Sequence, residues 1–389
     1  MRFIKQIFII SLFLYTITHS TSNAFAIHNP LDTPNNRFGI HILFTSEISE
    51  AAELVNSSGG DWGYVTIPIQ TSDKDIVKWQ IFLDQAKKHH LIPILRLATD
   101  GDYFNTSVWN KPNDAVVLDF ANFLSSLTWP TENKYIIVFN EVNRGDEWGG
   151  ESNPSEYAKL LSYAVTVFKS KDPSFFIISA GLDNAAENID GKSMNQYSYF
   201  TLMNEAVPGI FSQLDGISSH SYPNPGFSQP PTVLTAKSIS SFKYERDHIE
   251  SMGGKNLPVF ITETGWVTNS TNEKQHAEYF KQAFNNVWSD SSIVTVTPFI
   301  LNAGAGPFVQ FSLLKPDSNK TDRYNAIFNL PKTKGKPVLT NIRTVLGKAI
   351  LSYVLPTKDF SSYEKNKDLN GENKANATRI FLKWLLNIR

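Results

Sequence analysis

Two glutamates end apolar stretches of the chain, where a charged side chain is not expected. The run Tyr135–Phe139 leads directly into Asn140 and Glu141, and the run Pro258–Ile261 leads through a threonine into Glu263. A carboxylate at the end of a buried strand is costly unless it is solvated or hydrogen-bonded. Two such placements in one chain therefore favour a functional pair over salt-bridged or helix-capping glutamates. One protonated and one ionised carboxyl group flanking a glycosidic bond are the groups that hydrolyse it.

A third polar motif closes another apolar run. The segment Ser218–Pro223 contains His220 and Tyr222, which are two residues apart. On a strand such residues point to the same side, so both side chains are expected to face the same site. For His220 taken alone, packing in the core is the competing interpretation. Its combination with the two glutamates favours a functional role.

The elements that must position these residues alternate along the chain. Short runs rich in Val, Ile and Phe are separated by longer stretches with apolar residues at three- and four-residue spacing, which is typical of βα units around a parallel sheet. The expected strands are Phe38–Phe44, Trp62–Ile69, Leu91–Leu97, Tyr135–Asn140, Phe175–Ala180, Leu214–His220, Pro258–Glu263 and Ile293–Leu301. The expected helices include Asp75–His89, Asp114–Leu127, Pro154–Lys171, Ala236–Met252, Glu273–Trp288 and a last one at Pro337–Val354.

Eight strand–helix units over about 300 residues predict a (β/α)₈ TIM barrel, of the α/β class. The alternative is an open, doubly wound sheet, which should carry a Gly-rich phosphate-binding turn after an early strand. The sequence contains no such turn. In a parallel barrel the strands end at a common mouth, so residues that close strands far apart in sequence are expected to meet there.

With its glutamates closing the fourth and seventh strands, the chain resembles the retaining glycoside hydrolases of clan A, the 4/7 superfamily. The pair Asn140-Glu141 and the residue Glu263 match the positions that define this superfamily, and His220 and Tyr222 are similar to a His-x-Tyr signature on its sixth strand. The resemblance implies that Glu141 is the acid/base and Glu263 the nucleophile. It also implies that Asn140 binds the sugar 2-hydroxyl, that Tyr222 hydrogen-bonds the nucleophile and that His220 lines the subsite.

Two positions depart from the clan's pattern. Thr66 stands in the second strand where many members place an arginine close to the nucleophile, and the eighth strand lacks the tryptophan that commonly forms the floor of the sugar subsite. Arg96, near the end of the third strand, is expected to supply the missing positive charge. Phe299, Phe308 or Phe311 is expected to supply the missing ring.

Two tryptophans follow the glutamates closely. Trp148 lies in the loop after Glu141, and Trp266 comes three residues after Glu263. Aromatic faces stack on the apolar faces of sugar rings, so both are candidate substrate-binding residues. Ordinary packing of a loop aromatic is the alternative for each.

The two terminal segments of the chain have sequence patterns that differ from the strand–helix pattern of the barrel. Basic residues, a short apolar run and the small-x-small sequence ending at Ala26 predict a signal peptide over residues 1–26 and cleavage after Ala26, which directs the protein out of the cytoplasm. The barrel is expected over residues 27–356. Residues 357–378 are polar and predict a linker. Residues 379–389 predict a short amphipathic helix, either docked on the barrel, frayed, or in contact with a membrane.

Composition excludes several other functions. A formal net charge of −1 offers no field for binding nucleic acid, and the absence of cysteine removes thiol catalysis and thiolate metal sites. No metal-ligand spacing of histidines is present, so no metal and no cofactor are expected. The expected partner is an oligo- or polysaccharide, hydrolysed at a β-linked bond. A non-catalytic carbohydrate-binding barrel is the alternative; the identity of the sugar stays open.

Overall fold

The protein is described by a computed structural model, which covers residues 27–304 and 306–340. The described residues form eight parallel strands, each followed by helical structure, so the predicted (β/α)₈ barrel is confirmed. The strands are β1 (Gly39–His41), β2 (Gly63–Gln70), β3 (Leu91–Ala98), β4 (Lys134–Ile137), β5 (Phe175–Ile178), β6 (Ile217–His220), β7 (Val259–Glu263) and β8 (Ile293–Val296).

The barrel consists of two sheets that meet at two junctions. Strands β1 to β5 form one sheet in sequence order, and β6 to β8 form the other. The parallel bridge between Ile178 and Gly216 links β5 to the entry of β6, and the bridge between Phe38 and Val296 links β8 to the entry of β1. These bridges close the ring, so the carboxyl ends of all eight strands open at one mouth.

The strands are short and almost entirely buried, as their composition requires. Residues 91–97 of β3 are all buried, with one face toward the barrel interior and the other toward the helices. A strand covered on both faces needs apolar side chains on both, which is why these segments read as continuous runs of Val, Ile, Leu and Phe.

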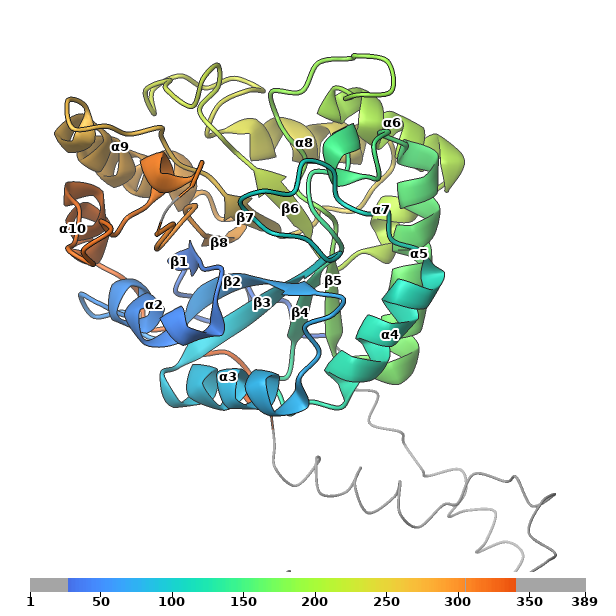
Figure 1. Ribbon diagram of the computed structural model, residues 1–389, viewed down its shortest axis with the longest axis horizontal. Coiled ribbons are helices and arrows are strands. Elements are labelled where there is room, and N and C mark those ends of the chain that lie inside the picture. The colour runs from blue at the N-terminus through green and yellow to red at the C-terminus, as the bar shows by residue number, and fades with distance from the viewer. Residues whose placement is uncertain (1–26, 305, 341–389) are drawn as a thin grey trace, which may run out of the picture. The chain divides into compact units, whose positions relative to one another are not determined.

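Helices surround the strands on the outside of the ring (Figure 1). The α-helices are α2 (Ile48–Val55), α3 (Ile76–Lys88), α4 (Asp114–Ser125), α5 (Pro154–Lys171), α6 (Gln196–Ala206), α7 (Ile210–Gln213), α8 (Ser241–Ser251), α9 (Glu273–Asn285) and α10 (Asp322–Phe328). Short 3-10 helices η1 (Thr45–Glu47), η2 (Gly145–Glu147), η3 (Val287–Ser289) and η4 (Val309–Phe311) lie between them.

Side-chain caps fix where several helices begin. The side chain of Asp75 accepts hydrogen bonds from the backbone of Val77 and Lys78 at the start of α3, and Asn153 caps α5 in the same way. Pro154 occupies the first turn of α5, where its missing N–H leaves no bond unmade. Such caps satisfy the free N–H groups of the first turn.

The prediction of a last helix at Pro337–Val354 is wrong for the part that the structure describes. Residues 337–340 are not helical, and Leu339 forms an antiparallel bridge with Thr131. The helix that follows β8 is α10, which packs against α9 and α2 and so completes the ring of helices. The remainder of that segment, the signal peptide, the linker and the tail helix lie outside the described residues. Within residues 27–304 and 306–340, no helix has the length and apolar character needed to cross a membrane.

Candidate active site

A cavity of about 340 Å³ opens at the carboxyl ends of the strands. Its walls combine five carboxyl groups, two arginines and a set of aromatic rings. They include Arg96, Asn140, Glu141, Arg144, Glu147, Asp183, Tyr222, Glu263, Tyr103, Trp109, Phe299, Phe308 and Phe311. Both glutamates predicted from the ends of the fourth and seventh strands therefore face one cavity.

Glu141 is presented by a tight turn after β4. The hydroxyl of Tyr157, from α5, donates to the carbonyl of Val138 at 3.0 Å and accepts from the N–H of Ala180 at 2.7 Å, which ties the ends of β4 and β5 to the helix. Glu141 itself has φ of +34°, a left-handed conformation that is unfavourable for this residue type. Its N–H donates to the carbonyl of Gly181 at 2.9 Å, which holds the turn in place.

Glu263 is the last residue of β7 and is held by two side chains from other strands. The guanidinium of Arg96, on β3, contacts its Oε1, and the hydroxyl of Tyr222 donates to its Oε2 at 3.0 Å. Burial alone would raise the pKa of Glu263, but the charges of His220 and Arg96 outweigh it and hold this pKa below its usual range. Glu263 is therefore kept ionised.

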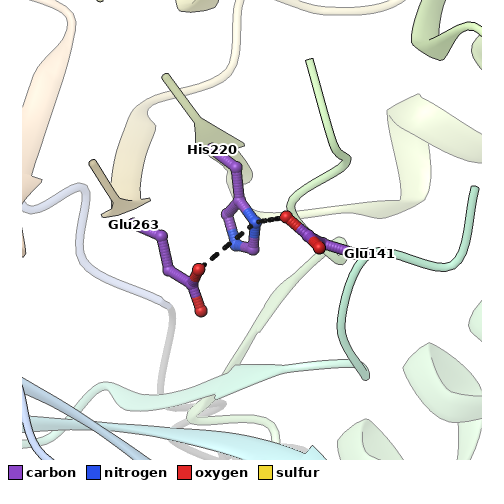
Figure 2. Close-up of side chains that lie close together, drawn as sticks. All are labelled: Glu141, His220 and Glu263. Carbon is purple, nitrogen blue, oxygen red and sulfur yellow. Dashed lines mark hydrogen bonds and ion pairs between the residues drawn. The ribbon is translucent and has the colours of Figure 1, made fainter. Parts of the chain in front are cut away.

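His220 lies between the two carboxylates (Figure 2). Its Nδ1 is 2.9 Å from Oε1 of Glu141 and 3.8 Å from Oε2 of Glu263. Burial opposes protonation, yet the charge of Glu263 and the hydrogen bond to Glu141 raise the pKa of this imidazole. The ring packs directly over Gly181, where any Cβ would collide with it. A glycine at this position is what allows His220 to reach both glutamates.

The two carboxyl groups are close together. One oxygen of Glu141, one of Glu263 and a ring nitrogen of His220 all lie within 4.8 Å of one another. Retaining glycosidases place their carboxyl groups about 5–5.5 Å apart, whereas inverting enzymes need about 6.5–9.5 Å to fit a water molecule. The nearest oxygens of Glu141 and Glu263 are closer than the inverting range requires.

The same three side chains are the group, among the residues that the structure describes, whose atoms could together hold a metal ion. Arg96 already contacts Glu263, and a fixed guanidinium there opposes the approach of a second cation. The arrangement thus fits a proton donor and a nucleophile better than a cation site.

Asn140 and Arg96 lie side by side in the wall of the cavity. Nη1 of Arg96 donates to Oδ1 of Asn140 at 2.7 Å as well as to Glu263. The expected position of Arg96 beside Glu263 is therefore confirmed. Thr66 is buried, and its hydroxyl is 3.3 Å from that of Thr297, so no positive charge comes from the second strand at this position.

Phe299 lines the cavity beyond the end of β8. Its ring packs edge-on against His41 and Phe308, with centroids 5.1 Å away in both cases, and Phe311 completes the cluster. The expected ring is present here, although partly covered by its neighbours.

The prediction that Trp148 and Trp266 bind substrate is wrong. Both are fully buried and neither lines the cavity. Trp148 packs against Phe139 and Tyr157, and Trp266 packs against aromatic residues of α9 and η3. The indole N–H of Trp266 donates to the carbonyl of Gln229 at 2.8 Å. Both rings therefore pack beneath the loops that carry them and do not face the cavity.

Several residues of the site were not predicted from the sequence. His41, the last residue of β1, is fully buried with Nε2 3.8 Å from Oε1 of Glu263, and burial lowers its pKa to about 3, so it is neutral. The signal was available, since His41 is a polar residue inside an apolar run. Arg144 pairs with Asp146 and lies 3.3 Å from a carboxylate oxygen of Glu141. Arg144 and Glu147 gave no comparable signal in the sequence because they lie between regular elements of the barrel.

The fold has well-matched neighbours among solved structures. A family 39 β-xylosidase from Caulobacter crescentus aligns with a TM-score of 0.55 at 15% identity, over 76% of this chain and 71% of that one. A glucosidase from Croceicoccus marinus aligns with a TM-score of 0.54 at 11% identity, over 77% and 68%. A family 39 glycoside hydrolase from Bacteroides cellulosilyticus aligns with a TM-score of 0.51 at 17% identity, over 78% of this chain and 64% of that one.

These neighbours are glycoside hydrolases with the barrel fold, as the sequence resemblance implied. No family model matches the sequence, and no match was found among curated proteins. At this level of identity the neighbours establish the fold.

Proposed function

We propose that the protein is a retaining glycosidase that hydrolyses β-linked sugars, with Glu263 as nucleophile and Glu141 as acid/base. The observation that carries the proposal is the pair itself: two carboxylates, one on the turn after β4 and one at the end of β7, with oxygens within 4.8 Å, facing one cavity. The unequal surroundings of the two groups support their separate roles.

Glu263 suits nucleophilic attack because its charge is stabilised in place. Contacts from Arg96 and Tyr222 keep the carboxylate ionised and fix its direction. In the first step a Glu263 oxygen bonds to the anomeric carbon while the bond to the leaving oxygen breaks. Glu141 transfers its proton to that oxygen, so the departing group leaves as a neutral alcohol.

In the second step Glu141, now ionised, takes a proton from water, and the resulting hydroxide attacks the anomeric carbon and releases Glu263. His220, which contacts Glu141 at 2.9 Å, orients this carboxyl group through both steps. Two displacements on the same carbon return the original configuration.

The apolar and polar walls of the cavity support a carbohydrate substrate. Tyr103, Trp109 and Phe308 offer ring faces, while Asn140 and Asp183 offer hydrogen-bonding groups. The signal peptide predicted over residues 1–26 supports a location outside the cytoplasm, where polysaccharides are accessible.

The test is a screen of aryl β-glycosides and polysaccharides with the wild-type protein and E263A. We expect hydrolysis by the wild type and a loss on the order of 10⁴-fold or more in the variant, since no other group can form the covalent intermediate. Equal activity of the two proteins on a cleaved substrate would contradict the assignment. Binding of oligosaccharides without cleavage would instead establish the non-catalytic carbohydrate-binding barrel.

A further inference from the structure

Strand β7 contains one more residue than the strand beside it, at the point just before Glu263. Ser219 of β6 pairs with Ile261 of β7. The next residue of β6 is His220, and it pairs with Glu263. Thr262 is therefore the extra residue of a β-bulge, the local irregularity by which a strand changes the direction of the side chain that follows.

The bulge decides whether Glu263 faces the cavity or the helices. Phe260 points into the barrel, where its ring meets that of Tyr135 from β4, and Ile261 packs in the core between strands and helices. Since side chains alternate between the two faces of a strand, regular alternation would turn Thr262 inward and Glu263 outward. The extra residue keeps Glu263 on the inner side, where it lines the cavity.

A hydroxyl group from the end of β8 holds the bulge in place. Oγ1 of Thr297 donates to the carbonyl of Thr262 at 2.7 Å, with a longer contact of 3.3 Å to the carbonyl of Ile261. The same oxygen accepts from Oγ1 of Thr66 at 3.3 Å, so its single proton is directed at the bulge. The hydroxyl of Thr262 in turn contacts that of Ser218 on β6. These hydroxyl groups are buried, where an unmade hydrogen bond is costly.

The position of Thr297 is fixed by the close approach of β1. A Cβ on Gly39, the first residue of β1, would lie 2.5 Å from Cγ2 of Thr297, so the absence of a side chain there makes the room for it. The neighbouring bridge between Phe38 and Val296 is one of the two junctions between the sheets. Thr297 is thus enclosed by the barrel itself, and its hydroxyl has little freedom to turn away from the bulge.

We propose that Thr297 is a positioning residue, which fixes the bulge at Thr262 and so aims the carboxylate of Glu263 at the substrate. The inference rests on the proposed glycosidase function and adds to it a side chain that does not line the cavity. A misplacement of about 1 Å in a reacting group can cost on the order of 10²-fold in rate. One hydrogen bond behind the proposed nucleophile can therefore control the first chemical step.

The test compares T297V, which keeps the shape of the side chain but removes the hydroxyl, with T66V, the matched control. T66V loses the contact to Thr297 and leaves the bond from Thr297 to Thr262 intact. With enzyme in excess over a dinitrophenyl β-glycoside that the wild type cleaves, the release of dinitrophenolate in a single turnover reports attack by Glu263. We expect this step to be on the order of 10- to 100-fold slower in T297V and within about threefold of the wild type in T66V. T297S, which keeps the hydroxyl, should recover most of the loss.

A T297V protein as fast as the wild type would overturn the proposal. Equal losses in T297V and T66V would also overturn it, because they would indicate a general packing defect. Crystal structures provide a readout that needs no activity: the 3.0 Å contact between the Tyr222 hydroxyl and Glu263 should lengthen in T297V and persist in T66V. Should the wild type cleave no glycoside, the proposed function fails, and an unchanged contact in T297V would separately overturn this inference.

Discussion

The guanidinium of Arg96 contacts the carboxylate of Glu263 although 167 residues separate them in sequence. Arg96 belongs to β3 in the five-stranded sheet, and Glu263 belongs to β7 in the three-stranded sheet. The contact crosses the mouth of the barrel and places a permanent positive charge on the proposed nucleophile. The second strand places no charge there, since Thr66 is uncharged and contacts Thr297.

Removing this charge should change the pH dependence of activity. In R96Q the pKa of Glu263 should rise, because burial is then opposed by less positive charge, so the carboxylate protonates at a higher pH. We expect the acidic limb of the kcat/KM profile to move to higher pH. R96K, which keeps a charge, should move it less, and T66S should leave it in place. An unchanged limb in R96Q would show that Arg96 does not control the ionisation of Glu263.

Removing the acid/base should affect the two steps differently. E141A lacks the proton donor, so substrates with poor leaving groups should react very slowly, while dinitrophenyl glycosides still form the covalent intermediate and stall at its hydrolysis. Added azide should restart the stalled step and yield a glycosyl azide with retained configuration. E263A should give no product under the same conditions. A rescue of E263A with retention, and not of E141A, would reverse the two assignments.

The buried tryptophans should matter for stability and not for substrate affinity. Trp266 is fully buried and packs against aromatic residues of α9 and η3, so W266A should lower the free energy of unfolding by about 3–5 kcal/mol. W266F, which retains a ring, should lose less and should leave KM near the wild-type value. Denaturant unfolding and steady-state kinetics of the two variants provide the measurement. A large rise in KM for W266F with unchanged stability would restore Trp266 to the binding site.

A buried carboxyl group behind the site should make stability depend on pH. Glu245, on α8, is enclosed with Ser219 and Ser241 behind β6, and burial raises its pKa to about 7. The folded state therefore keeps a proton that the unfolded chain loses above its ordinary pKa of 4.5. The retained proton of Glu245 raises the free energy of unfolding by an amount on the order of 3 kcal/mol. This stabilisation is fully present below pH 4.5 and is lost as the pH rises toward 7.

The variant E245Q stays neutral at every pH and removes this dependence. As the pH rises from 4.5 to 8, we expect the melting temperature of E245Q to increase relative to that of the wild type. Calorimetry at a series of pH values measures this difference. Other titrating groups cancel in the comparison. A constant difference across the range would show that Glu245 has no raised pKa in the folded protein.

The sequence predicted the barrel because its strands must be apolar on both faces, a pattern that continuous runs display directly. The predicted strand ends were less accurate, because the chain stops pairing with its neighbouring strands before the apolar residues stop. The strand β8 ends at Val296, whereas the apolar run continues to Leu301. The helix α10 was missed because seven residues give too few turns for a periodic pattern.

Position relative to the strands also explains which site residues could be predicted from the sequence and which could not. A charged residue at or just after the end of a buried strand lies at the mouth of a barrel, so the positions of Glu141 and Glu263 could be predicted from the sequence. A residue in a loop has no such fixed position, and nearness in sequence to a glutamate proved misleading for Trp148. Glu147, from the same loop, faces the cavity because of glycine turns and carbonyl contacts that no periodicity encodes.

The two-sheet construction of the barrel has a consequence for how reactivity can be altered. Glu141 follows a strand of the larger sheet and Glu263 ends a strand of the smaller one. The distance between the two glutamates therefore depends on how the two sheets are placed relative to each other. At one of the junctions between the sheets the bridge between Ile178 and Gly216 is reinforced by Asp215, whose carboxylate accepts from the N–H of Ile177 at 2.8 Å. Asp215 precedes β6 at the end of the strand away from the cavity, so we expect a change there to alter the spacing of the two glutamates without touching either of them.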